Sequence, residues 1–177
     1  MLTMPSFRVD VEFSYGWCCL GLEQSGQSIT IKNHWMNDGF SDLVDALRLI
    51  LTGTRAVAVP WLREVAGGHF LDLVADPGGG INIAVHETRY GADADADSPG
   101  QIWNAVRGSA QFQARVMTGE FAQACAAGLR RVRTNQVDTT GMIQHWQYSF
   151  PQAPFEAIER IAEKYGYQPE HALQRHM

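Results

Sequence analysis

The start of the chain alternates hydrophobic and polar side chains, as half-buried strands do. In residues 7–14 every second position is apolar, and these positions are Phe7, Val9, Val11 and Phe13. A period of two puts those side chains on one face of a strand and the polar ones on the other. Turns at 15–16 and 24–27 separate this strand from a second over 17–23 and a third over 28–33. Because sequential strands usually pair, we expect a three-stranded meander.

The period then changes to that of a helix over residues 39–53. Its apolar positions lie three and four residues apart: Phe40, Leu43, Val44, Leu47, Ile50 and Leu51. Such spacing makes one apolar stripe along a helix, and Asn37 or Asp38 can cap its start. Residues 55–62 return to a strand pattern that contains Pro60. Since proline cannot donate to a ladder of hydrogen bonds, we expect this strand to lie at a sheet edge or to end there.

A glycine-rich loop at residues 76–80 predicts a hairpin, and burial favours one register for it. That register places Leu71 opposite Val85 and keeps the apolar side chains on one face. A shift by one residue would place Leu73 opposite Asn82 and mix the two faces along the whole strand. We therefore expect the first register.

The last part of the chain predicts one more strand and two helices. Alternation over 111–116 indicates a late strand, and Thr118 is placed to cap the helix after it. The buried stripe of that helix comprises Phe121, Ala124, Cys125, Leu129 and Val132. Residues 154–166 predict the final helix, with Pro154 in its first turn. The tail over 166–177 is expected to add a short turn or to fray.

These elements define an α+β fold in the order βββαββββαα. We expect a single domain over residues 1–177, with about six or seven mostly antiparallel strands and with three helices packed on one face of the sheet. The chain is long enough to bury a core without disulfides or metals.

Composition narrows the classes of function. The net charge is −5, whereas nucleic-acid binding needs a basic surface, so we expect no nucleic-acid partner. The start of the chain lacks a basic flank before an apolar run, and no segment approaches the roughly 20 apolar residues of a membrane span. Cys18 and Cys19 are adjacent and would point to opposite faces of a strand. We expect these thiols and Cys125 to be reduced, in a cytoplasmic protein without a membrane partner.

Two histidines of the predicted hairpin, His69 and His86, are candidate metal ligands. In the register that burial favours, His69 lies opposite Glu87, and the imidazoles of His69 and His86 point to different faces. No third ligand stands at a suitable spacing. We therefore expect neither a metal nor another cofactor, and we assign both histidines to the polar ends of the strands.

An acidic loop has the opening spacing of a calcium-binding loop, through Asp93, Asp95 and Asp97. The sixth position is Ser98 instead of glycine, and the twelfth is Asn104 instead of glutamate. Without that bidentate carboxylate a calcium ion would be under-coordinated, so we reject the motif. The charge of the loop could instead dock onto a basic protein.

Motifs of common catalytic sites are missing, since the chain contains no GxSxG, HExxH or CxxC sequence. A Cys19–His145 pair stays open as nucleophile and base, with nothing in the sequence to single it out. Trp35, in the polar stretch KNHWMNDG, and Trp103, beside the acidic loop, resemble the aromatic side chains of protein interfaces. We take these two tryptophans and the three aspartates of the loop as candidate partner-binding residues.

The segment before the last helix carries three alternating aromatic side chains, Trp146, Tyr148 and Phe150. In an extended chain they would share one face and clamp the segment to the sheet, leaving His145 exposed. Pro151 and Pro154 disfavour helix in the residues before them, so we expect the chain to approach the last helix in an extended conformation.

Two stretches resemble motifs of a group of small uncharacterised bacterial proteins, D-x-L-x-x-A-x-x-L-x-x-G in the first helix and W-x-x-x-F-P before the last. The matching residues are Asp42, Val44, Ala46, Leu47 or Leu49, Gly53, Trp146, Phe150 and Pro151. Val44 and the spacing of the leucines depart from the first motif. The resemblance covers most of residues 7–165 and rests on packing residues, so it bears on the fold. Many proteins of this size and layout are immunity proteins that neutralise toxins, which implies a protein partner by analogy.

We therefore expect a non-enzymatic protein-binding domain, an antagonist of the immunity or antitoxin type whose partner is a toxin. The alternative is a small-molecule-binding or hydrolytic domain with a pocket between the sheet and the last two helices. A third hypothesis is a homo-oligomer formed through the strand at residues 55–62.

Overall fold

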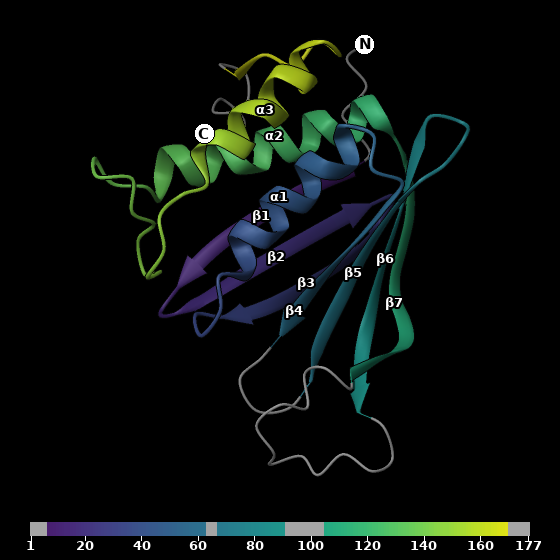
Figure 1. The fold of residues 1–177 in the computed structure, drawn as a ribbon, viewed down its shortest axis with the longest axis horizontal. Coiled ribbons are helices and arrows are strands. Elements are labelled where there is room, and N and C mark those ends of the chain that lie inside the picture. The colour runs from purple at the N-terminus through teal and green to yellow at the C-terminus, as the bar shows by residue number, and fades with distance from the viewer. Residues whose placement is uncertain (1–6, 63–66, 91–104, 170–177) are drawn as a thin grey trace.

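The computed structural model describes residues 7–62, 67–90 and 105–169 (Figure 1). Its strands are β1 (Phe7–Ser14), β2 (Trp17–Gln24), β3 (Gln27–His34), β4 (Ala56–Leu62), β5 (Gly68–Ala75), β6 (Gly80–Tyr90) and β7 (Ala105–Met117). Its helices are α1 (Gly39–Leu51), α2 (Thr118–Asn135) and α3 (Gln152–Glu163). The α+β class and the predicted order of elements are confirmed.

The strands form two antiparallel sheets, β1–β2–β3 and β4–β5–β6–β7. The meander and the position of β4 at a sheet edge are as predicted, and β3 lies beside β4, with α1 connecting the two (Figure 1). In the β5–β6 hairpin Leu71 pairs with Val85, so the predicted register is confirmed. The ladder between β6 and β7 is irregular from Val85 to Thr88.

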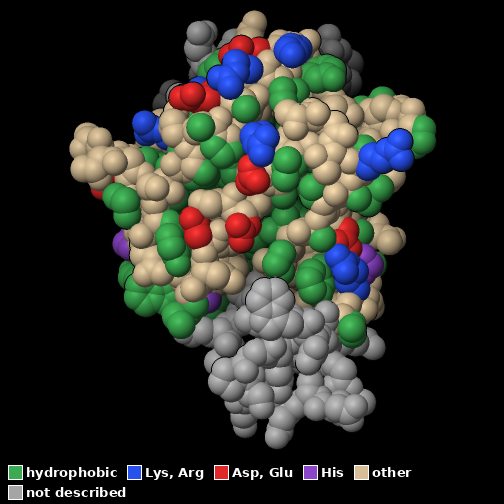
Figure 2. Space-filling model, viewed as in Figure 1, with side chains coloured by type: hydrophobic (Ala, Val, Ile, Leu, Met, Phe, Trp, Pro, Cys, Tyr) green, Lys and Arg blue, Asp and Glu red, His purple; other side chains and the backbone are tan. Residues whose placement is uncertain are grey.

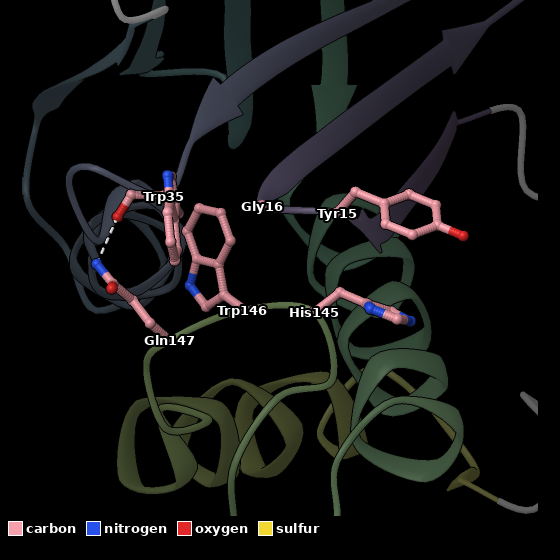
Figure 3. Close-up of a pocket in the computed structure, with 6 residues that line it drawn as sticks. All are labelled: Tyr15, Gly16, Trp35, His145, Trp146 and Gln147. Carbon is pink, nitrogen blue, oxygen red and sulfur yellow. Dashed lines mark hydrogen bonds between the residues drawn. The ribbon is translucent and has the colours of Figure 1, made fainter.

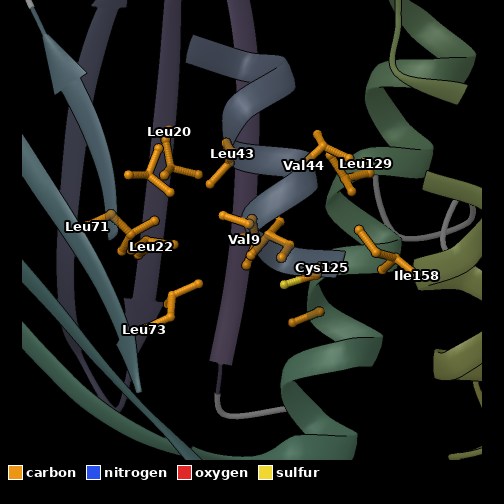
Figure 4. Close-up of a cluster of buried hydrophobic side chains, with 14 of the residues drawn as sticks. Val9, Leu20, Leu22, Leu43, Val44, Leu71, Leu73, Cys125, Leu129 and Ile158 are labelled. Carbon is orange, nitrogen blue, oxygen red and sulfur yellow. The ribbon is translucent and has the colours of Figure 1, made fainter. Parts of the chain in front are cut away.

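The helices of the described chain lie on one side of the sheets, as expected (Figure 1). α1 packs on β4 and α2 on β1, whereas α3 packs on α1 and α2 as an outer layer. The core between sheets and helices is apolar, and Figure 4 shows leucines of β2 and β5 near α1. α2 lies so close to β1 that a methyl group on Gly128 would be 2.5 Å from the Val9 carbonyl oxygen, to which Arg131 also donates (2.7 Å).

The two predicted helix caps have different outcomes. Asp38 caps α1, where its carboxylate accepts a hydrogen bond from the Ser41 amide (3.2 Å). The prediction for Thr118 was wrong, because it is the first residue of α2 and Met117 holds the cap position. The Thr118 hydroxyl donates instead to the Gly79 carbonyl oxygen of the β5–β6 turn (2.9 Å), so a tertiary contact replaces the local one.

An ion pair holds α3 against α2. The Nε atom of Arg130 lies 2.8 Å from Oε1 of Glu159, a buried carboxylate. Tyr167 is buried as well, and burial together with the nearby Glu159 carboxylate raises its pKa to about 12. The start of the expected tail is thus packed against the helices, while residues 170–177 lie outside the described chain.

Candidate functional site

The loop before α3 is clamped to the core by two aromatic side chains. Trp146 and Phe150 are both buried, and the ring of Trp146 meets that of Phe13 on β1 at a tilted, edge-on angle with 5.2 Å between centroids. The predicted burial of Trp146 and Phe150 is confirmed, whereas Tyr148, the third residue of the expected clamp, is only partly buried. His145 is exposed, also as predicted.

The same loop is not extended as expected, because the backbone turns at His145, where φ is +60°. Asp138 organises the start of the loop: its Oδ1 atom accepts hydrogen bonds from the amides of Thr140 (2.8 Å) and Met142 (3.0 Å). Hydrogen bonds from these two residues lower the pKa of Asp138. These contacts hold residues 138–142. The turn at His145 is closed separately, by the Trp146 N–H, which donates to the Ile143 carbonyl oxygen (3.2 Å).

The β1–β2 turn lies next to this loop. Tyr15 and Gly16 have φ values of +47° and +84°, both positive as in a type I′ hairpin turn. The Gly16 N–H donates to the His145 carbonyl oxygen (3.1 Å), and the Trp35 N–H donates to the Gly16 carbonyl oxygen (2.9 Å). One glycine therefore ties the turn to the loop before α3 and to the segment between β3 and α1.

These three segments surround a hollow of about 310 Å³ (Figure 3). Its lining consists of Tyr15, Gly16, Trp35, His145, Trp146 and Gln147. Figure 3 shows Trp35 and Trp146 on one side of Gly16, with Tyr15 and His145 on the other. The rings of Tyr15 and His145 lie beside each other, with 5.4 Å between their centroids.

Large side chains around the hollow are exposed to solvent. Tyr15 is 87% exposed, Met36 69% and Trp35 43%. Together with the exposed His145 we call these residues the aromatic surface. His34 extends it toward the outer face of the first sheet, because its ring lies 6.0 Å from that of Trp35 and 4.7 Å from that of Trp17. Exposed apolar groups gathered in one place make this surface a candidate interaction site.

Carboxylates border the aromatic surface. Asp38, half-buried at the start of α1, has its Oδ1 atom 3.5 Å from Nε1 of Trp146. Burial, together with the carboxylates of Asp38 and Asp45, raises the pKa of Asp42 in the first turn of α1. At the lower left of Figure 2, hydrophobic and histidine side chains gather below acidic ones, and no Lys or Arg is visible among them.

Of the residues predicted to bind a partner, the structure places Trp35 in the aromatic surface. The other four lie outside the described chain and stay predictions: Asp93, Asp95, Asp97 and Trp103. The sequence assigned Tyr15 only to a turn, whereas the structure also places it in the lining of the hollow. Its signal was the turn type, since type I′ turns favour asparagine or glycine where this chain has a bulky tyrosine.

The structure does not bring the two hairpin histidines together. His69 pairs with Glu87 as predicted and is buried, with its Nε2 atom 3.0 Å from Oε1 of Gln111. His86 has its Nε2 atom 3.7 Å from Oδ2 of Asp72. Across the described parts of the chain, no three His, Cys, Asp or Glu side chains are grouped so that they could hold a metal ion.

Cys19 does not have the surroundings of an activated nucleophile. Burial raises the pKa of its thiol, the facing Lys32 opposes that rise, and the facing Glu12 adds to it. A raised pKa reduces the fraction of thiolate, which is the reactive form of a catalytic cysteine.

A small void lies between the sheets and the helices in the described part of the chain. The void there measures about 10 Å³ and is lined by apolar residues of both sheets, α1 and α2. A cavity needs roughly 10–15 Å³ to hold a single water molecule. This void is therefore too small for the substrate or ligand of the alternative hypothesis.

Fold and surface together define the class of the protein: an α+β fold of two antiparallel sheets under helices, with an aromatic surface at one end of the first sheet. Comparisons of the chain with protein-family models, curated proteins and solved structures find no match. Within the described residues, no helix is both long and apolar enough to cross a membrane.

Proposed function

We propose that the chain is a non-enzymatic protein-binding domain that docks onto its partner through the aromatic surface. The observation that carries this proposal is Tyr15, which is 87% exposed and has a φ of +47°. A left-handed conformation costs a residue with a side chain roughly 1–2 kcal/mol, and an exposed ring regains little of that cost by burial. Strained residues gather at functional sites, and tyrosine and tryptophan are enriched among the residues that dominate binding energy.

The shape of the hollow favours a protein partner over a small molecule. Small-molecule sites enclose about 70–90% of their ligand, whereas Tyr15 and Trp35 leave this hollow open to solvent. Protein interfaces are enriched in aromatic residues and methionine. Met36 supplies an exposed, adaptable apolar side chain directly after Trp35.

The finer form of this proposal is a toxin antagonist of the immunity type. The resemblance of the sequence supports it, and so does the net charge of −5, which suits a basic partner. An adjacent toxin-like open reading frame would identify the candidate. If the chain binds the purified toxin no more tightly than it binds an unrelated protein, the proposal of a toxin antagonist is contradicted.

Affinity capture with matched baits tests the role of the aromatic surface. Asparagine adopts positive φ values readily, so Tyr15→Asn removes the ring and keeps the turn. Ser25→Asn makes the same change in the β2–β3 turn, where Ser25 has a φ of +50°. We expect Ser25→Asn to recover the same partner as the unmodified chain, and Tyr15→Asn to recover at least about ten times less. Equal recovery by the Tyr15→Asn bait would contradict the proposal.

A further inference from the structure

We infer that the hollow receives the guanidinium group of an arginine from the partner protein. This inference rests on the proposed function and deepens it, because it names the chemistry of the group that the aromatic surface binds. The arginine contacts inside the chain, the hydrogen-bonding groups of the hollow and the surrounding charge all favour such a guest.

The chain itself binds arginine between a ring and a carboxylate in two places. The ring–arginine pairs are Phe70 with Arg107 (4.6 Å from ring centroid to Cζ) and Phe155 with Arg130 (5.1 Å). Each guanidinium also pairs with a carboxylate, Asp72 in the first case and Glu159 in the second. An aromatic face beside a carboxylate is thus a recurring arginine site in this fold.

The hollow has the same two components and no cation of its own. Trp35, which is 43% exposed, offers the ring face. Asp38 offers the carboxylate beside the hollow, where its Oδ1 atom lies 3.5 Å from Nε1 of the buried Trp146. None of the described residues that line it is Lys or Arg. Tryptophan offers the most favourable ring face for a cation, and arginine is the cation found there most often.

The hydrogen-bonding groups of the hollow also favour a guest that donates. The N–H groups of Gly16 and Trp35 already donate to carbonyl oxygens within the site (3.1 and 2.9 Å). The Gln147 amide donates to the Trp35 carbonyl oxygen (2.8 Å) and to the Tyr148 hydroxyl (2.9 Å). These donors are occupied, whereas each carbonyl oxygen can accept a second hydrogen bond. Arginine has five N–H donors, no acceptor, and a planar group that stacks on aromatic rings.

Charge complementarity points to a basic partner. The chain carries a net charge of −5, and Asp38 and Asp42 stand at the start of α1. Asp38 lies 3.5 Å from Trp146, which lines the hollow. A carboxylate beside the hollow favours a positive group and disfavours a negative one, and this preference sets specificity more than affinity.

Titration with a short peptide tests the inference directly. The probe is a blocked pentapeptide with one central arginine, and its control carries citrulline, which has nearly the same shape and no charge. We expect the arginine peptide to shift the indole N–H signals of Trp35 and Trp146 in ¹H–¹⁵N NMR spectra. The signal of the fully buried Trp61 should stay unchanged. We expect the citrulline peptide to bind about two- to five-fold more weakly.

Two variants measure what the Asp38 carboxylate contributes to binding of the arginine peptide, apart from the aromatic rings. Asp38→Asn keeps a capping side chain on α1 and removes the charge, so it should weaken binding of the arginine peptide at least about two-fold. Asp45→Asn is the control, because Asp45 already binds Arg48 on the same helix (2.7 Å). It should leave the affinity unchanged, and thermal melting confirms that both variants are folded.

Equal shifts with the citrulline peptide, or no shift of the Trp35 and Trp146 signals with the arginine peptide, would overturn the inference. Either result leaves the proposed function standing if Tyr15→Asn still recovers at least about ten times less of the partner. Failure of the proposed function has a different signature, namely full capture of the partner by the Tyr15→Asn bait.

Discussion

The two turns of the first sheet share a backbone conformation and differ in their surroundings. The φ values are +47° and +84° at Tyr15–Gly16 and +50° and +83° at Ser25–Gly26. At the second turn, nothing lies within 4 Å of a methyl group added to Gly26. At the first turn, the same group on Gly16 would lie 3.5 Å from the Trp35 ring, and backbone hydrogen bonds tie the turn to two other segments.

Local sequence accounts for the shape of each turn, and tertiary context accounts for its role. A glycine-containing dipeptide between two alternating strands favours a type I′ hairpin in both cases. Only the first turn has an aromatic residue before its glycine and two loops packed against it. Matched variants of the two turns therefore distinguish an effect on partner binding from an effect on folding of the hairpin.

The largest effect is expected at Trp146, and the comparison with Trp35 separates the core from the surface of the hollow. Trp146 is 6% exposed and packs on Phe13, so Trp146→Ala should lower the free energy of unfolding by about 3–5 kcal/mol. Trp35 is 43% exposed, so Trp35→Ala should cost less than about 1 kcal/mol while weakening the partner complex. Urea denaturation measures both changes. Similar losses of stability in the two variants would show that Trp35 belongs to the core.

A smaller effect is expected when the glycine of each turn is replaced. Gly16→Ala and Gly26→Ala both force a side chain into a left-handed conformation, at a cost of about 1–2 kcal/mol each. The added methyl group of Gly16→Ala meets Trp35 at 3.5 Å, an ordinary van der Waals distance. We therefore expect the two losses, measured by urea denaturation, to agree within about 0.5 kcal/mol. A much greater loss at Gly16 would mean that Trp35 cannot yield to the new methyl group.

The smallest effect is a gain of stability. Tyr15→Asn should raise the free energy of unfolding by about 0.5–1 kcal/mol, because asparagine tolerates the left-handed region better than tyrosine does. Ser25→Asn should produce a similar or smaller gain in the same thermal melt. A destabilised Tyr15→Asn protein would instead show that the ring supports the fold through its contact with His145.

Much of the fold could be predicted from the sequence. Burial of apolar side chains determines the helices and hairpins, and the residues involved are close together in the chain. Pairing Leu71 with Val85 keeps apolar side chains together within one hairpin, and the structure has that register. The helix predicted over 39–53, observed as Gly39–Leu51, likewise follows from its apolar stripe and from the Asp38 cap. The cap predicted at Thr118 was wrong because the contact is not local. The Thr118 hydroxyl donates to the carbonyl oxygen of Gly79, which is far away in the chain.

The candidate site was harder to predict from the sequence, because it is formed by contacts between segments that are far apart in the chain. The Gly16 N–H meets the His145 carbonyl oxygen from the other end of the chain, and no periodicity encodes that contact. The turn at His145 also puts a bulky residue at positive φ, which sequence patterns rarely predict. Trp35 could be proposed only because a large aromatic residue stands in a polar stretch.

The dissociation constants of the purified partner for Tyr15→Asn and Ser25→Asn, measured by isothermal titration calorimetry, test the role of the aromatic surface most directly. We predict that Ser25→Asn binds within about two-fold of the unmodified chain, and that Tyr15→Asn binds at least about ten-fold more weakly, with both variants folded. Equal affinities of the two variants would place the partner elsewhere on the protein and contradict a binding role for the aromatic surface.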